Sequence, residues 1–140
     1  MTRLALALLF AVLASLSSGA AELTITVEGI RSAKGDIRLS LYTSAAEWPE
    51  HSTRDHDQAQ PAKVGGLTFK FQVPSGSYAA AGYHDENGNG KFDTTLIGLP
   101  EEGYMFSNNV RPVLSAPSFA SASFAVPQEG KAISIVVRYP

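Results

Sequence analysis

Alternation of apolar and polar residues with a period of two constrains the fold of this chain more than any other feature. Four regular runs show it, over residues 22–28, 36–41, 67–73 and 132–138. Successive side chains of a strand point to opposite faces of its sheet, so each run predicts one buried and one solvated face. Two less regular runs, 77–84 and 118–126, continue the pattern, and a short further strand is expected near residues 62–64.

Compact turn signals separate these runs. They lie at residues 31–35, 65–66, 74–77 and 127–130, and each contains glycine. Short alternating strands with such turns are typical of a β-sandwich or barrel. No strand–helix–strand spacing occurs, so we do not expect a parallel sheet. The chain is predicted to be all-β, with about seven antiparallel strands in a single domain.

The first residues have the layout of a secretory signal peptide. A positive start at Arg3 precedes an apolar run over residues 4–14 and a small, polar stretch over residues 15–21. A transmembrane anchor is the alternative, but the run falls short of the ~20 residues that span a bilayer. We therefore predict a cleaved signal peptide at 1–21, a mature domain at 22–140 and a periplasmic or secreted location.

Composition removes several classes of function. The chain has no cysteine, which excludes disulfides and a thiol nucleophile. Its formal net charge is −2 and it has no basic run, so neither nucleic-acid binding nor attachment to a membrane surface is expected. We expect no transmembrane segment in the mature chain. The oligomeric state stays open.

A loop with calcium-site spacing follows the run that ends at His84. Oxygen-bearing side chains, a turn glycine and a residue that offers its backbone carbonyl come in the order Asp85, Asn87, Asn89, Gly90, Lys91 and Asp93. These positions match the start of the pattern D-x-[DN]-x-[DN]-G, in which a coiled loop turns alternate oxygens toward one ion. The loop opens a long segment without clear alternation, residues 85–116.

The match to a calcium loop is incomplete. The twelfth position is Leu96 instead of a bidentate glutamate, and no flanking helices are predicted, so an EF-hand is not expected. We expect Glu101 or Glu102 to supply the missing oxygens, with Glu86 or a backbone carbonyl next. The predicted cofactor is a structural calcium ion. The alternative is that the Asn-Gly pairs at 87–88 and 89–90 form plain type I′ turns.

Several motifs also resemble those of the bacterial DUF2141 family. They are Gly76–Ala79, the segment His84–Asp93, the block Gly98–Tyr104, the block Phe106–Asn109 and the two C-terminal stretches Phe119–Val126 and Ile133–Tyr139. The resemblance covers essentially the whole mature chain. It implies an exported protein with an immunoglobulin-like or transthyretin-like sandwich, and it implies no particular activity.

The block at residues 98–109 suggests a ligand site. Tyr104, Phe106, Asn108 and Asn109 combine flat apolar faces with amide groups, as in modules that hold a carbohydrate or a peptide. Alternatively, the aromatic residues close one end of the core and the asparagines form turns. Trp48, the single tryptophan, either fills the core or marks a partner surface.

No catalytic residue is predicted. His51, His56 and His84 lack the spacing of zinc ligands, and no G-x-S-x-G motif occurs. The leading interpretation is an exported, non-catalytic module that serves the cell envelope as a binding or accessory protein. Two alternatives are a hydrolase-type enzyme with its active site at the 84–109 rim, and an envelope assembly subunit.

Overall fold

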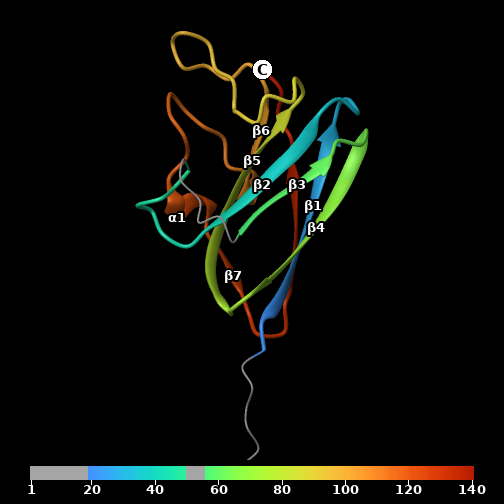
Figure 1. Ribbon diagram of the computed structural model, residues 1–140. Helices are drawn as coiled ribbons and strands as arrows, with labels where there is room; N and C mark the ends of the chain where they lie inside the picture. Colours follow the sequence, from blue (N-terminus) through green and yellow to red (C-terminus); the bar gives the residue numbers. More distant parts are fainter. Residues whose placement is uncertain (1–18, 50–55) are drawn as a thin grey trace, which may run out of the picture.

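Two β-sheets packed face to face make up the protein (Figure 1). The computed structural model describes residues 19–49 and 56–140. His51 and almost all of the predicted signal peptide, residues 1–21, lie outside these residues. Eight strands occur in the described part of the chain, one more than expected, and the prediction of an all-β sandwich is confirmed.

The first sheet has three strands, in the order β4, β1, β8. These are β4 (Gly65–Val73), β1 (Ala21–Ile30) and β8 (Lys131–Val136). β1 pairs with β4 in antiparallel fashion but with β8 in parallel, which differs from the all-antiparallel expectation. The reason is that the chain reaches β8 from the other sheet, so β8 starts at the same end as β1. Leu23 near the start of β1 lies opposite Lys131, the first residue of β8.

The second sheet carries the candidate site. Its main order is β3 (Asp57–Pro61), β2 (Asp36–Tyr42), β5 (Gly76–Asp85) and β6 (Gly103–Phe106). β5 is long enough to have two partners on one edge. Its first residues pair with β7 (Phe124–Val126) and its last residues with β6. The long loop between β5 and β6 therefore starts and ends side by side.

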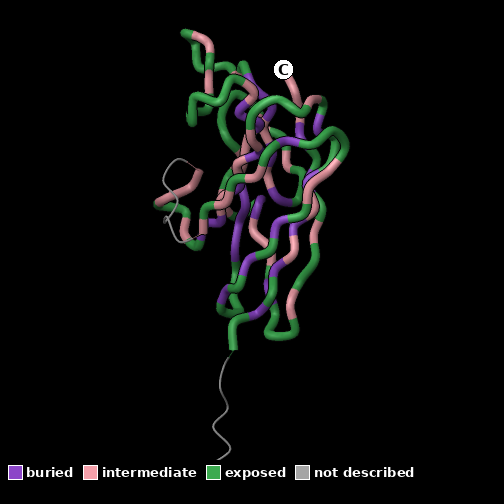
Figure 2. Tube along the Cα trace, turned by 45° about the vertical axis from the view of Figure 1, so that its right-hand side comes forward, coloured by how far each residue is buried: buried purple, intermediate pink, exposed green. Residues whose placement is uncertain are grey.

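The core lies between the two sheets. The inward residues of each strand alternate with solvated ones, which Figure 2 shows as short purple segments along the strands. The largest fully buried apolar side chains are Leu23, Ile25, Val27, Ile37, Leu39, Leu41, Phe69, Val73, Met105, Val126 and Ile135. These residues come from both sheets, so the predicted alternating runs do supply the core.

Three short elements differ from the sequence prediction. β3 lies in a stretch for which no strand was predicted, and it replaces the strand expected at 62–64. It is a polar edge strand, and the side chains of Gln58 and Gln60 donate to the carbonyls of Lys70 and Thr68 in β4. The run at 118–126 divides into a helical turn, α1 (Phe119–Ala122), and β7.

Trp48 lies outside the inter-sheet core. It is half-buried on the outer side of the second sheet, where its indole N–H donates to the carbonyl of Pro117 at 2.7 Å. Its ring packs against Tyr42, Phe106 and Phe119 with centroid distances of 5.1, 5.7 and 6.1 Å. Trp48 therefore joins its own loop, after β2, and the segment at Pro117 to the second sheet. In the two described segments, no helix is long and apolar enough to cross a membrane.

Candidate functional site: the 85–93 loop and the outer face of the second sheet

Asp85 begins the loop and fixes its first turn. It is the last residue of β5 and is fully buried. Its two carboxylate oxygens accept hydrogen bonds from the backbone N–H groups of Asn89, at 3.2 Å, and Gly90, at 2.8 Å. Arg38 of β2 places its Nε 3.5 Å from the same carboxylate. The chain is thus coiled around the Asp85 side chain.

Asp93 closes the loop through two asparagine side chains. The amide nitrogens of Asn87 and Asn89 donate to its carboxylate, and Asn89 contacts both oxygens at 2.8 and 2.9 Å. These hydrogen bonds, that from Asn89 first, lower the pKa of Asp93. The amide oxygens of the same asparagines accept the backbone N–H groups of Asn89 and Lys91. The amide nitrogens of the two asparagines therefore converge on Asp93, whereas the predicted calcium site needs their oxygens to converge, and that site stays a prediction.

Glu102 enters the loop from the other side. Its side chain is buried, with a relative exposure of 5% for the residue, and one carboxylate oxygen accepts the backbone N–H of Asp93 at 3.1 Å. The other oxygen, Oε1, is buried without a hydrogen-bond partner. Burial, together with the negative charges of Asp93 and Asp85, raises the pKa of Glu102 to about 7, and the hydrogen bond from the Asp93 N–H opposes this rise.

The other acidic candidates turn away from the loop centre. Glu101 is exposed, and only its backbone N–H reaches the loop, donating to the carbonyl of Asp93 at 3.0 Å. Glu86 forms an ion pair with Arg31 and accepts the hydroxyl of Ser32 at 2.8 Å, contacts that lower its pKa. Of the two neighbouring glutamates, Glu102 is the one that faces Asp85 and Asp93.

The loop is held by hydrogen bonds in the structure. Within the described part of the chain, no three His, Cys, Asp or Glu side chains form a group that could hold a metal ion. The carboxylates of Asp85, Asp93 and Glu102 are therefore not gathered around one ion position in the structure.

His84, which precedes the loop, has a structural position. Its ring is fully buried, with Nδ1 2.7 Å from the hydroxyl of Tyr139 and Nε2 2.7 Å from the carbonyl of Lys34. The guanidinium of Arg31 stacks on the Tyr139 ring at 4.2 Å. Both imidazole nitrogens are thus engaged in joining β5 to the β1–β2 turn and the C-terminal segment. Nothing in this arrangement presents His84 to a substrate.

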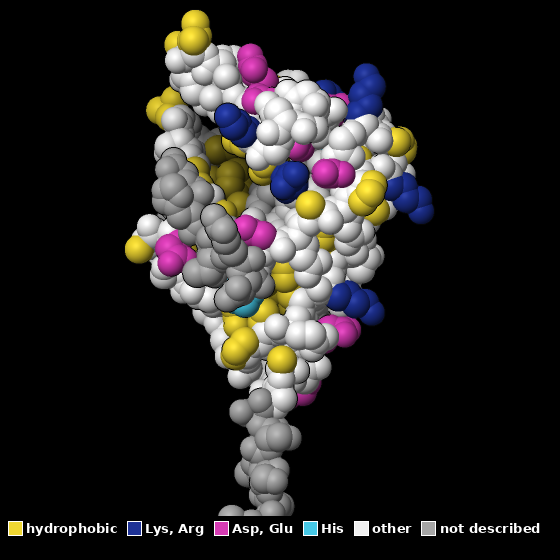
Figure 3. Space-filling model, in the orientation of Figure 1, with side chains coloured by type: hydrophobic (Ala, Val, Ile, Leu, Met, Phe, Trp, Pro, Cys, Tyr) yellow, Lys and Arg dark blue, Asp and Glu magenta, His cyan; other side chains and the backbone are white. Residues whose placement is uncertain are grey.

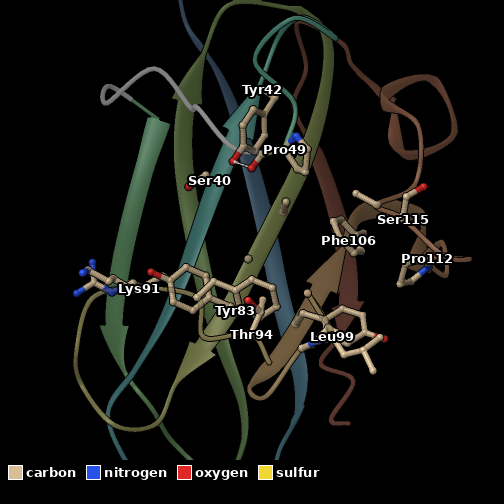
Figure 4. Close-up of a pocket in the computed structure, with 18 of the residues that line it drawn as sticks. Ser40, Tyr42, Pro49, Tyr83, Lys91, Thr94, Leu99, Phe106, Pro112 and Ser115 are labelled. Atoms are coloured by element: carbon tan, nitrogen blue, oxygen red, sulfur yellow. Dashed lines mark hydrogen bonds between the residues drawn. The ribbon is translucent and has the colours of Figure 1, made fainter. Parts of the chain in front are cut away.

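A cleft of about 860 Å³ lies beside the loop, on the outer face of the second sheet. Its floor consists of outward residues of β2, β5 and β6, among them Ser40, Tyr83 and Phe106. Its walls are the segments 90–100 and 112–116. Figure 4 shows Lys91 and Tyr83 at one end and Tyr42 with Pro49 at the other. In Figure 3 the hollow has a hydrophobic floor, with basic side chains near its border.

The model of one protein family matches the chain over residues 25–134, described as an uncharacterized protein conserved in bacteria (DUF2141). The chain belongs to the DUF2141 family. The match spans both sheets and includes the whole 85–93 loop and Glu102. Searches of curated proteins and of solved structures found no match. Family membership therefore confirms the resemblance, and it assigns no activity.

The predicted ligand-binding residues of this DUF2141 member divide into two pairs. Tyr104 and Phe106 line the cleft. Asn108 and Asn109 have positive φ angles of 59° and 50° and secure turns instead. The amide of Asn108 donates to the carbonyls of Ser121 and Ser123, and the Asn109 side-chain oxygen accepts the N–H of Val136 at 2.9 Å.

The sequence pattern did not predict this cleft. Arg38, Ser40 and Tyr42 line it from alternate positions of β2, and Tyr83 lines it from β5. The alternation does place these residues on one outward face. It gives no sign that loops from residues 90–100 and 112–116 enclose that face, because loop positions leave no periodic signal.

Proposed function

We propose that this protein is an exported, non-catalytic binding module of the cell envelope whose 85–93 loop binds a structural calcium ion. The observation that carries the proposal is the carboxylate of Glu102. It is buried beside Asp85 and Asp93, and its Oε1 has no hydrogen-bond partner. An unpaired carboxylate is costly to bury, and a cation between these groups would offset that cost.

The available oxygens suit calcium. The proposed ligands are the carboxylates of Asp85, Asp93 and Glu102, the amide oxygens of Asn87 and Asn89, and the carbonyl of Lys91. Calcium takes six to eight such oxygens at about 2.3–2.6 Å, with more tolerance of irregular geometry than magnesium. Glu102 would supply what position 12 of the loop, Leu96, does not.

The hydrogen bonds to Asp93 support a position for the ion beside this carboxylate. The amide nitrogens of Asn87 and Asn89 both point at it, so their partial positive charges stand where a cation would lie. Half a turn of each amide about its last bond would replace the nitrogen by an oxygen acceptor of similar size. Calcium binding would also require the carboxylates of Asp85, Asp93 and Glu102 to move closer together, since they form no metal-binding group in the structure.

A calcium titration followed by NMR tests the proposal. The side-chain NH₂ resonances of Asn87 and Asn89 should shift with a Kd of roughly 10⁻⁴–10⁻³ M, the range of extracellular calcium modules. Glu102→Gln should weaken binding at least about tenfold, because it removes a charged ligand. The matched control is Glu101→Gln, which should leave the affinity unchanged. Equal affinities for the two variants, or no shifts at either asparagine, would overturn the assignment.

A further inference from the structure

We infer that the cleft on the second sheet binds a monomeric, single-chain anionic amphiphile, such as a medium-chain carboxylate. The inference rests on the proposed binding role of the module and specifies its ligand class. A volume of about 860 Å³ lies within the ~300–1,000 Å³ range of small-molecule sites. The cleft combines an apolar body with one basic end, and these two properties define the ligand.

Exposed apolar side chains gather on the two walls of the cleft. Eight large hydrophobic residues are exposed in the described part of the chain. Three of them line the cleft itself: Phe92, Leu99 and Leu114. Leu96, Ile97 and Val113 lie on the same two segments but are not part of the lining. Apolar residues concentrated around one hollow mark a binding surface. An alkyl chain in the cleft would cover the three lining residues.

The floor favours an apolar body over a carbohydrate. Tyr42 and Tyr83 contribute to the cleft lining while their hydroxyls donate within the protein, to the carbonyls of Pro49 and Gly90. These donors are therefore already used. A sugar needs several oriented hydrogen-bond groups, whereas an alkyl chain needs only the ring faces and the aliphatic walls.

The floor also disfavours a peptide. Peptides commonly dock by adding a strand to an open sheet edge. The cleft lies over β2 and β5, and each of these strands pairs with a neighbour on both sides. Their backbone groups are therefore engaged within the sheet, and a peptide backbone lying over them would find no partners there.

Arg38 and Lys91 define the basic end. Both line the cleft, and the side chain of Arg38 is 40% exposed, while its Nε is buried and lies 3.5 Å from Asp85. The acidic groups near them are Asp36, 3.9 Å from Arg38, Asp85 and Asp93, and calcium on the loop would offset the charge of the loop carboxylates. No acidic side chain of the described residues belongs to the lining, so Arg38 and Lys91 are the charged groups in the cleft that can pair with an anionic headgroup.

Fluorescence of Trp48 provides the assay, because this single tryptophan contacts Tyr42 and Phe106 of the floor. Decanoate is titrated into the calcium-loaded protein, with decanol and decyltrimethylammonium as probes of equal chain length. Decanoate should bind at least about tenfold more tightly than either. Lys91→Gln should weaken decanoate alone, about fivefold, the size of a partly exposed ion pair. Lys70→Gln, on the opposite sheet, is the charge-matched control.

The possible results separate this inference from the calcium proposal. Equal binding of all three probes, or none, would overturn the anionic-amphiphile inference even where calcium still shifts the loop asparagines. Failure of calcium to bind would instead overturn the proposed loop function. The contact between the alkyl chain and the apolar walls has its own variant: Leu114→Ser should weaken decanoate and decanol by the same factor, and an unchanged affinity would contradict the role of the apolar walls.

Discussion

Among single residues, Glu102 matters most for the proposed calcium site, because it is the glutamate that lies against the loop. Its neighbour Glu101 has the same chemistry and is exposed, while Glu102 is buried against Asp93. The difference follows from the pairing register of β5 and β6. Tyr104 lies opposite Tyr83 and Gly103 lies opposite His84, so the next residue, Glu102, comes next to Asp85. A shift of the chain by one residue would bring Glu101 to the loop instead.

Glu102 gives the protein a specific pH dependence when calcium is absent. Its pKa in the folded state is about 7, against 4.5 as the ordinary value. Between these values the folded state retains a proton that the unfolded state has lost. The free energy of unfolding should therefore fall as pH rises from 5 to 8, by about 3 kcal/mol at most. Urea unfolding in chelator at several pH values measures this slope.

Glu102→Gln is the control for the pH dependence. It keeps the shape of the side chain and removes its titration, so most of the decline between pH 5 and 8 should disappear. Other groups of the fold are unchanged in the variant. The same decline in both proteins would show that Glu102 is not the responsible group.

The sequence pattern indicated which loop residues interact with one another better than it indicated which glutamate joins them. Asn87 and Asn89 contact Asp93, and Asp85 accepts the N–H groups of the same loop, because these contacts are local. The convergence of their oxygens on one ion stays a prediction. The choice between Glu101 and Glu102 depends on the register of β6 against β5. That register is a long-range property, and residues 94–102 contain no alternation from which it follows.

At the scale of elements, β5 organises the second sheet. It pairs with β2 on one edge and with β7 and then β6 on the other. Ser107, just after β6, joins these parts: its hydroxyl accepts the N–H of Ala80 at 2.9 Å and donates to the carbonyl of Ala122 in α1. One buried hydroxyl thereby links β5, β6 and α1.

Ser107→Ala should be destabilising by about 1–3 kcal/mol, because it leaves the buried N–H of Ala80 and the carbonyl of Ala122 without their partner. Chemical denaturation measures the change. Ser115→Ala, at an exposed position of a cleft wall, should cost less than about 0.5 kcal/mol. A Ser107→Ala protein as stable as Ser115→Ala would contradict the linking role.

Elements with one wet and one buried face were predictable, and polar or very short elements were not. β1, β2 and β4 bury every second residue, which is the pattern that alternation detects. β3 has no apolar face. It is an edge strand, and glutamine side chains join it to β4 by hydrogen bonds. β6 has four residues, too few for a periodic signal.

In the molecule as a whole, the hydrophobic core and the candidate binding site occupy different places. The core lies between the sheets, while the loop and the cleft lie on and beside the outer face of one sheet. Figure 1 shows the long β5–β6 connection at the end of the sandwich opposite to the start of β1. The loop can therefore respond to a ligand without repacking the core.

Thermal melting with calcium and with chelator shows whether the 85–93 loop binds calcium. At a calcium concentration ten times a Kd of about 10⁻⁴ M, binding to the folded state adds about 1.4 kcal/mol, which is roughly 5 °C in Tm for a domain of this size. We expect this increase in Tm for the wild-type protein and for Glu101→Gln, and we expect no increase for Glu102→Gln. Identical melting curves in calcium and in chelator for the wild-type protein would contradict the proposed calcium site.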